Sequence, residues 1–422
     1  VAAIAYFFLK LVSEAQTWFF TTAPKQLGFK AAPMWWPLPL LAVGGLLVGL
    51  SIRYLPGTSG HKPAEGLKSG GPVPTIELPG IVLASLATLC LGAVLGPEAP
   101  LILIGNGIAI VLLRLLKKDA PQQAALVIGA AGSFAAIATL LGSPIVGAFL
   151  LMEMAGVSGA ELDLVLVPGL LAAGIGALVF VGLDSLTGFG TFALAVPNIP
   201  HFGTPTIGEF GWALVIGVAA AILGTAIRRL ALALQPIVER RMVLLTPILG
   251  LAVAGLAIAF AEATNKSNSE VLFSGQSALP ALIQQAATWT AGALVLLVLF
   301  KGLAYGLSLA GFRGGPVFPS LFIGAAGGMA LSHLAGLPMI AGTAMGIGAM
   351  SAVMLGLPLT AVLLASLILE ADAVVLMPLV IVAVVVAYVV TARLTPAPPA
   401  DSAPAPPSTS QAPAPVASTN PG

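Results

Sequence analysis

Charged side chains are scarce in this sequence. Its 422 residues include only 17 Lys and Arg and 16 Asp and Glu, so 8% of the chain is charged, against about 25% in a typical soluble domain. So few charges cannot cover the surface of a soluble globule, which excludes an ordinary cytosolic domain and a disordered protein. The formal net charge of +1 also argues against a nucleic-acid partner, because binding to phosphates needs clustered basic residues.

Cysteine and histidine are nearly missing as well. The single cysteine, Cys90, excludes an intrachain disulfide and a cysteine-based metal site. Three histidines, His61, His201 and His333, lie far apart in the sequence, so we expect neither a metal nor a cofactor. An enzyme would need a nucleophile with its base, a carboxylate pair or a metal cluster. No such set occurs at a credible spacing, and we expect that the chain is not an enzyme.

Apolar residues, by contrast, make up 58% of the chain, and the mean hydropathy is +1.05. A membrane-spanning helix needs about 20 mostly apolar residues. Candidate segments lie near residues 1–20, 34–50, 79–95, 99–116, 122–154, 162–183, 208–235, 243–262, 288–311, 317–337, 338–369 and 373–392. The sequence therefore predicts an all-α, multi-pass integral membrane protein surrounded by lipid.

Several of these segments have unusual lengths. Segments 79–95 and 99–116 are short; Pro97 lies between them, and Pro100 is the second residue of the later segment. Segments 122–154 and 338–369 are long, and each contains a Gly-x-Pro sequence, at 142–144 and 356–358. We expect helices that stop and restart within the bilayer, which is tolerated only where protein buries the open backbone or a cavity borders it.

Two decapeptides share one pattern. Residues 96–105 read GPEAPLILIG and residues 315–324 read GPVFPSLFIG, so both follow G-P-x-x-P-x-x-x-I-G. The sequences GSPI at 142–145 and GLPL at 356–359 follow in the same order. We therefore predict one membrane domain over 1–394, made of two repeated halves at about 1–190 and 205–394. The remainder, 395–422, is rich in Pro, Ala and Ser and is predicted to be a disordered tail.

Repeated halves with broken helices are common among transporters, whose binding sites lie where the halves meet. In both decapeptides prolines precede an apolar run, as expected at the start of a helix. Two helix starts that converge inside the membrane would form an anion site without any Lys or Arg, since each presents unpaired N–H groups and positive potential. The alternative is two ordinary proline turns at the membrane surface.

Glu98 is the residue that argues against surface turns, because it lies in an otherwise uncharged stretch from residue 80 to 113. An intramembrane carboxylate is costly and usually functional. Ionised, Glu98 would occupy a site meant for a permeant anion, and protonated, it would swing away; the alternative is a fixed helix cap.

Three other polar residues lie in or next to the apolar segments. Glu153 is interpreted either as a structural group or as part of a proton path. Ser59, after an apolar helix, offers a hydroxyl to an anion or caps a helix. Lys301 has a side chain long enough to reach the membrane interface, and we assign it no role.

Together these residues resemble the CLC family of chloride channels and proton-coupled chloride transporters, over residues 1–394. The GPEAP sequence at 96–100 is similar to the family's gating motif, and GPVFP at 315–319 is similar to its G-x-F-x-P motif. The family's serine loop resembles residues 59–61. Its paired-glutamate stretch resembles residues 142–153, and its late APLTGIVLVLE stretch resembles residues 357–370.

The resemblance implies inverted halves, a homodimer with one anion pathway per subunit, and transport of small inorganic anions, most simply chloride. It implies that Glu98 is the gate and proton carrier, and it places Glu153 at the first position of the family's glutamate pair. It also implies that Ser59 and the backbone of Glu98, Ala99, Val317 and Phe318 line the anion path. A passive channel and a non-transporting scaffold with the same fold remain alternatives. We expect a bacterial cell membrane as the location.

Some positions depart from the family pattern. Pro97 and Pro316 have no N–H, so two backbone donors are missing near the anion path. The family's tyrosine hydroxyl is expected to be absent, because Ala373 takes that position. Met154 replaces the second glutamate of the family's pair, which by itself does not separate a channel from a proton exchanger.

Overall fold

The computed structural model describes residues 1–67, 71–138, 140–156, 160–188, 202–369 and 373–395, and within these ranges the secondary structure is helical. The helices in chain order are α1 (Ala2–Thr17), α2 (Ala23–Gln26), α3 (Pro37–Tyr54), α4 (Leu78–Cys90), α5 (Glu98–Leu116), α6 (Gln122–Ile137), α7 (Pro144–Ala155), α8 (Ala160–Thr187), α9 (Ile207–Arg240), α10 (Met242–Thr264), α11 (Leu279–Gln284), α12 (Ala291–Gly311), α13 (Val317–Leu331), α14 (Met339–Leu355), α15 (Pro358–Leu369) and α16 (Ala373–Leu394). A π turn at Trp18–Thr22 follows α1, and short 3₁₀ turns occur at Pro63–Glu65, Thr75–Glu77, Asn268–Glu270 and Ala286–Thr288.

Within the described residues, seven helices are long and apolar enough to cross a membrane, and the shorter apolar helices lie among them. Apolar side chains cover much of the outer surface, including large ones such as Leu178 and Val181 on α8. A soluble protein would bury such side chains, whereas lipid solvates them. The chain is an integral, multi-pass membrane protein, as the composition predicts.

The two long apolar segments are each broken into two helices. The first break lies between α6 and α7, where Gly142 has a φ of +75° and Ser143 caps α7 by accepting a hydrogen bond from the Val146 N–H at 3.5 Å. The second lies between α14 and α15, where Gly356 has a φ of +70°. Glycine adopts positive φ without steric cost, and Gly356 is the residue that caps the end of α14, whereas α6 already ends at Ile137. Proline fits the first turn of a helix, and α7 and α15 both begin at the proline of their Gly-x-Pro sequence. The predicted breaks are confirmed.

The two halves repeat the same packing. In the first half α5 crosses α6 where Gly105 faces Gly132, and a Cβ on either glycine would overlap the other's backbone. In the second half α13 crosses α14 in the same manner, where Gly324 faces Gly346. Glycine allows helix backbones to approach this closely in a membrane. The helices that begin at the two decapeptides therefore occupy equivalent places, as expected for inverted repeats.

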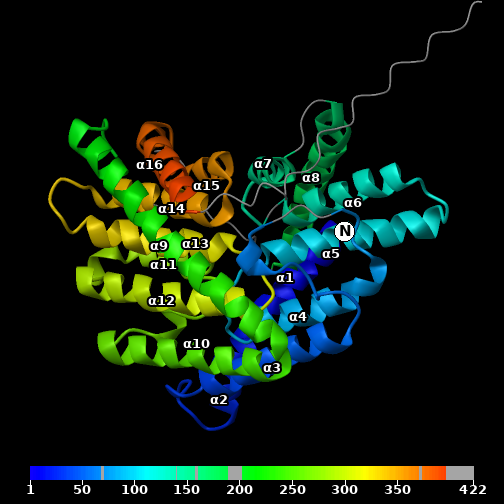
Figure 1. The fold of residues 1–422 in the computed structure, drawn as a ribbon, viewed down its shortest axis with the longest axis horizontal. Helices are drawn as coiled ribbons and strands as arrows, with labels where there is room; N and C mark the ends of the chain where they lie inside the picture. The colour runs from blue at the N-terminus through cyan, green and yellow to red at the C-terminus, as the bar shows by residue number, and fades with distance from the viewer. Residues whose placement is uncertain (68–70, 139, 157–159, 189–201, 370–372, 396–422) are drawn as a thin grey trace, which may run out of the picture.

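Figure 1 shows the two halves side by side, with α4–α8 on the right of the view and α9 and α12–α16 on the left. Helices α3 and α10, which belong to different halves, pack against each other at the lower edge. There Gly45 lies against the backbone of Thr246 and Pro247. Helices α5 and α13, which begin within the two decapeptides, lie in the interior of the chain, and their first turns are buried.

Parts of two predictions lie outside the described residues. Residues 396–422, which make up all but the first residue of the predicted tail, are outside the described residues. Residues 189–201, which include much of the predicted link between the halves, are outside them as well. The limits of the membrane domain and the disorder of the tail stay predictions.

Candidate functional site

The starts of α5 and α13 meet in the protein interior. Gly96 and Gly315, which precede these helices, form an isolated antiparallel bridge. The Gly96 N–H donates to the Gly315 carbonyl at 2.8 Å, and the Gly315 N–H donates to the Gly96 carbonyl at 2.6 Å. Pro97 and Pro316 then cap the two helices with nearly equal backbone angles. Two helix N-termini, each with partial positive charge, therefore face one small region.

The Glu98 carboxylate lies between these two helix starts. The residue is 1% exposed, and its Oε1 accepts a hydrogen bond from the Phe318 N–H of α13 at 2.8 Å. Its Oε2 is buried and has no hydrogen-bond partner among the described residues. A Cβ on Gly96 or on Gly315 would overlap this carboxylate, so the space that holds it exists because both positions are glycine. Surface turns, the alternative for the two decapeptides, are excluded by this burial.

Ser59 lies beside the same helix start. It is 1% exposed, adopts a φ of +53°, and its hydroxyl has no hydrogen-bond partner in the described part of the chain. Ser59, Ala99 and Arg313 border one small cavity. The structure therefore brings together two residues predicted at the anion path and adds a cation that sequence reasoning missed. One signal marked it: Arg313 is the single Lys or Arg between residues 302 and 392.

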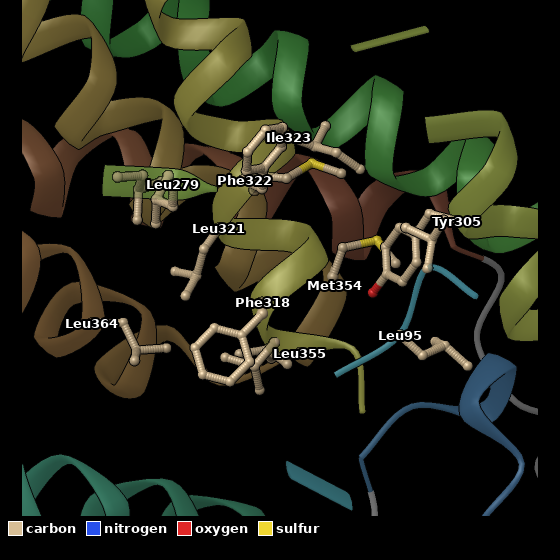
Figure 2. Close-up of a cluster of buried hydrophobic side chains, with 14 of the residues drawn as sticks. Leu95, Leu279, Tyr305, Phe318, Leu321, Phe322, Ile323, Met354, Leu355 and Leu364 are labelled. Carbon is tan, nitrogen blue, oxygen red and sulfur yellow. The ribbon is translucent and has the colours of Figure 1, made fainter. Parts of the chain in front are cut away.

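Val317 and Phe318 form the first turn of α13, and both are buried. Figure 2 shows the Phe318 ring beside Leu355 and Leu364, in an apolar cluster. The side chain of Phe318 therefore packs in the core, while its N–H binds Glu98. At this position it is the backbone that can serve an anion.

Tyr305 is a second residue that sequence reasoning missed. It is fully buried on α12, and its hydroxyl donates to the Pro316 carbonyl at 2.9 Å (Figure 2). Ala373, where the resemblance predicts a lost tyrosine, begins α16 and carries no hydroxyl. A different tyrosine thus supports the start of α13. Its position in the middle of an apolar helix gave no sequence signal.

Glu153 lies on α7 and holds the start of α15. Its carboxylate accepts hydrogen bonds from the Leu359 N–H at 3.0 Å, the Thr360 N–H at 2.7 Å and the Thr360 hydroxyl at 2.6 Å. A carboxylate at a helix start satisfies unpaired N–H groups and complements the helix dipole. These contacts support the structural interpretation, and the role in a proton path stays a prediction.

Lys301 lies in the protein interior. Its side chain does not reach the membrane interface but is fully buried. The ammonium lies within hydrogen-bond distance of four consecutive carbonyl oxygens, of residues 270–273, at 2.8 to 3.3 Å, which its three N–H groups share. It also lies 4.4 Å from the centre of the Phe322 ring. These carbonyls and the ring replace the water that the charge would otherwise require.

No cluster of three or more metal-ligating side chains occurs within the described residues. The arrangement is instead suited to a small anion: two helix starts, one carboxylate that occupies their meeting point, a hydroxyl and a buried guanidinium.

Comparisons with known proteins match this chain along most of its length. Residues 44–392 match the sequence model of the family described as "Voltage gated chloride channel". Curated relatives include proteins named "Putative ion-transport protein YfeO" from Escherichia fergusonii and from Escherichia coli O7:K1. Each is 27% identical to this chain, over 74% of this chain and 72% of the relative.

Two solved structures share the fold. One is a slow cyanobacterial Cl⁻/H⁺ antiporter, at a TM-score of 0.73 and 18% identity, covering 93% of this chain and 92% of that one. The other is a CLC-type fluoride/proton antiporter, at a TM-score of 0.67 and 19% identity, covering 92% of each chain. At this identity they show the architecture, and the family model shows the kinship. With well over half of its length matched by that model, the chain belongs to the voltage-gated chloride channel, or CLC, family.

Proposed function

We propose that this chain carries chloride across the membrane in exchange for protons and that Glu98 is its gate. The observation that carries the proposal is the Glu98 carboxylate, which lies between the starts of α5 and α13 and accepts a hydrogen bond from the Phe318 N–H. Membership of a family of anion channels and transporters supports anion transport. The two antiporters that share the fold support a proton as the second substrate.

Gating follows from competition for the same N–H groups. Ionised, the Glu98 carboxylate is an anion bound at helix N-termini, so it takes the place that chloride would take. Protonated, it loses the charge that holds it there and leaves, which opens the place to chloride and moves one proton. Gly96 and Gly315 leave room for the carboxylate at this point.

The proposed path continues from Glu98 to the cavity bordered by Ser59 and Ala99. Val317 and Phe318 contribute backbone rather than side chains, because both side chains are buried in the apolar core. We infer that protons pass either by way of Glu153 or through water, since Met154 stands where the family has its second glutamate.

Assembly and location are part of the same proposal. We infer a homodimer with one pathway per subunit, embedded in the lipid of a bacterial cell membrane; relatives from enterobacteria agree with a bacterial source. The membrane domain would end near residue 394, where α16 ends.

The test is chloride efflux from proteoliposomes, with the external pH recorded at the same time. Glu98→Ala, Glu98→Gln and the control Glu14→Gln, whose carboxylate is 66% exposed, are compared with the unaltered chain. We expect chloride release to drive proton uptake in the unaltered chain and in the control, and both Glu98 variants to abolish the coupling.

Other outcomes separate the alternatives. Chloride flux without proton movement would favour a passive channel and remove the exchange mechanism. Flux of neither chloride nor fluoride would favour a non-transporting scaffold.

A further inference from the structure

Arg313 lies in the turn between α12 and α13, two residues before Gly315. Its side chain is buried, at 4% exposure. The Nε–H donates to the Thr58 carbonyl at 3.1 Å, and an Nη1–H donates to the Phe312 carbonyl at 3.1 Å. The hydrogen bonds of the guanidinium in the described chain therefore go to neutral carbonyl oxygens.

Two carboxylates influence this cation from further away, those of Glu239 and Glu65. Both already pair with Lys62, at 2.7 Å for Glu239 and 3.9 Å for Glu65. Within the described residues, no carboxylate lies within the 4 Å of an ion pair with Arg313. A buried charge without a close counter-ion is costly. An anion bound beside this guanidinium would reduce that cost.

Beside the guanidinium is the small cavity that Ser59 and Ala99 also border. The Ser59 hydroxyl is 1% exposed and has no partner in the described part of the chain. Ala99 belongs to the first turn of α5, where the helix dipole is positive. The cavity measures about 10 Å³, which is the space for one water molecule or one ion of similar size.

From these contacts we propose that Arg313 and Ser59 hold a small monovalent halide next to the Glu98 gate, with the halide as counter-ion of the guanidinium. This rests on the proposed function and adds the residue that supplies the positive charge. Pro97 and Pro316 withhold two backbone donors nearby, and the N–H groups of Arg313 replace them. The small volume restricts the ligand to compact ions and excludes sulfate, phosphate and organic anions.

The test is halide binding to the purified full-length chain in detergent, measured by calorimetry with sodium fluoride and sodium chloride, with sodium gluconate as the bulky anion. Arg313→Gln keeps an N–H that can reach the Thr58 carbonyl but removes the charge. We expect Arg313→Gln to weaken halide binding 10-fold or more and Ser59→Ala to weaken it several-fold. Gluconate is expected to bind neither the unaltered chain nor the variants. Arg393→Gln, at an exposed position on α16, is the matched control and is expected to bind as the unaltered chain does.

Arg313→Lys separates charge from support of the Ser59 loop. It retains the positive charge, so we expect halide affinity within a few-fold of the unaltered chain. Affinity as poor as that of Arg313→Gln would overturn the proposal, because the side chain would then matter only for the shape of the loop. Unchanged affinity in Arg313→Gln would overturn it as well. If Arg313→Gln does not fold, Ser59→Ala decides, and unchanged affinity there has the same meaning.

Flux measurements keep this inference separate from the proposed function. Halide flux in proteoliposomes together with unchanged binding in Arg313→Gln would leave transport standing and refute the role of Arg313. Halide binding that depends on Arg313, in a chain that transports no halide, would leave the site standing and refute transport.

Discussion

Substituting Gly96 by alanine tests the position of the Glu98 carboxylate, the proposed gate, without changing Glu98 itself. A Cβ on Gly96 would overlap both oxygens of the Glu98 carboxylate, and the nearest atoms that it meets all belong to that side chain. The backbone there does not have the positive φ that would forbid alanine. The carboxylate is the movable partner, so we expect it to leave its place between α5 and α13 while the helices stay.

The size of the effect follows from what the carboxylate loses. Leaving breaks the hydrogen bond from the Phe318 N–H, and a hydrogen bond to a charged group contributes about 1.5–3 kcal/mol. Since 1.4 kcal/mol corresponds to a factor of ten, the displaced state gains about 10- to 100-fold in population. Gly96→Ala should therefore approach Glu98→Ala in chloride flux and lose most of its proton coupling, although its glutamate is intact.

The assay is chloride efflux with proton uptake recorded, compared across Gly96→Ala, Glu98→Ala and the unaltered chain. Gly292→Ala is the control, because a Cβ at this glycine on α12 meets no atom within 4 Å. Unaltered flux and coupling in Gly96→Ala, alongside a clear change in Glu98→Ala, would refute the placement of the carboxylate between Gly96 and Gly315.

Three further variants test the packing around the site, each by thermal unfolding in detergent. Glu153→Ala removes the acceptor of three hydrogen bonds at the start of α15 and should lower the free energy of unfolding by about 2 kcal/mol. The control Glu14→Ala, at an exposed position, should cost almost nothing. Equal losses of stability in the two variants would contradict the capping role. Lys301→Met removes the donor of four carbonyls, of which those of residues 271 and 272 are buried, and should cost about 3 kcal/mol. An unchanged melting temperature would show that the ammonium contributes no net stability. Gly328→Ala places a Cβ on the Gly342 carbonyl and should cost about 1–3 kcal/mol, whereas Gly327→Ala, whose Cβ would meet one atom at 3.9 Å, should be tolerated.

Local chemistry explains why the breaks of the fold could be predicted. Proline and glycine restrict or release the backbone at their own positions, so the Gly-x-Pro sequences at 142–144 and 356–358 predict a break in each long apolar segment. The two decapeptides likewise predict helix starts at Glu98 and Val317, and both helices begin there. Glu98 was identifiable because a lone carboxylate in an apolar stretch is costly and is usually functional.

Contacts between distant segments could not be predicted in the same way. Lys301 is one cation in an apolar helix, and nothing near it in the sequence tells that four carbonyls of residues 270–273 surround it. Arg313 resembles an ordinary loop residue until the loop that carries Ser59 lies against it. Tyr305 contacts the Pro316 carbonyl only because α12 packs beside the start of α13.

By itself, then, the sequence determined the membrane class, the repeat, the helix breaks and the carboxylate that we propose as the gate, because composition and backbone preference act locally. The tertiary structure alone decided which groups meet: Gly96 with Gly315, Glu98 with the Phe318 N–H, and Ser59 with Arg313. These partners lie in opposite halves of the chain. Their contact depends on how the glycine-lined helices pack the two halves together. No local sequence pattern encodes which residues of the two halves come into contact.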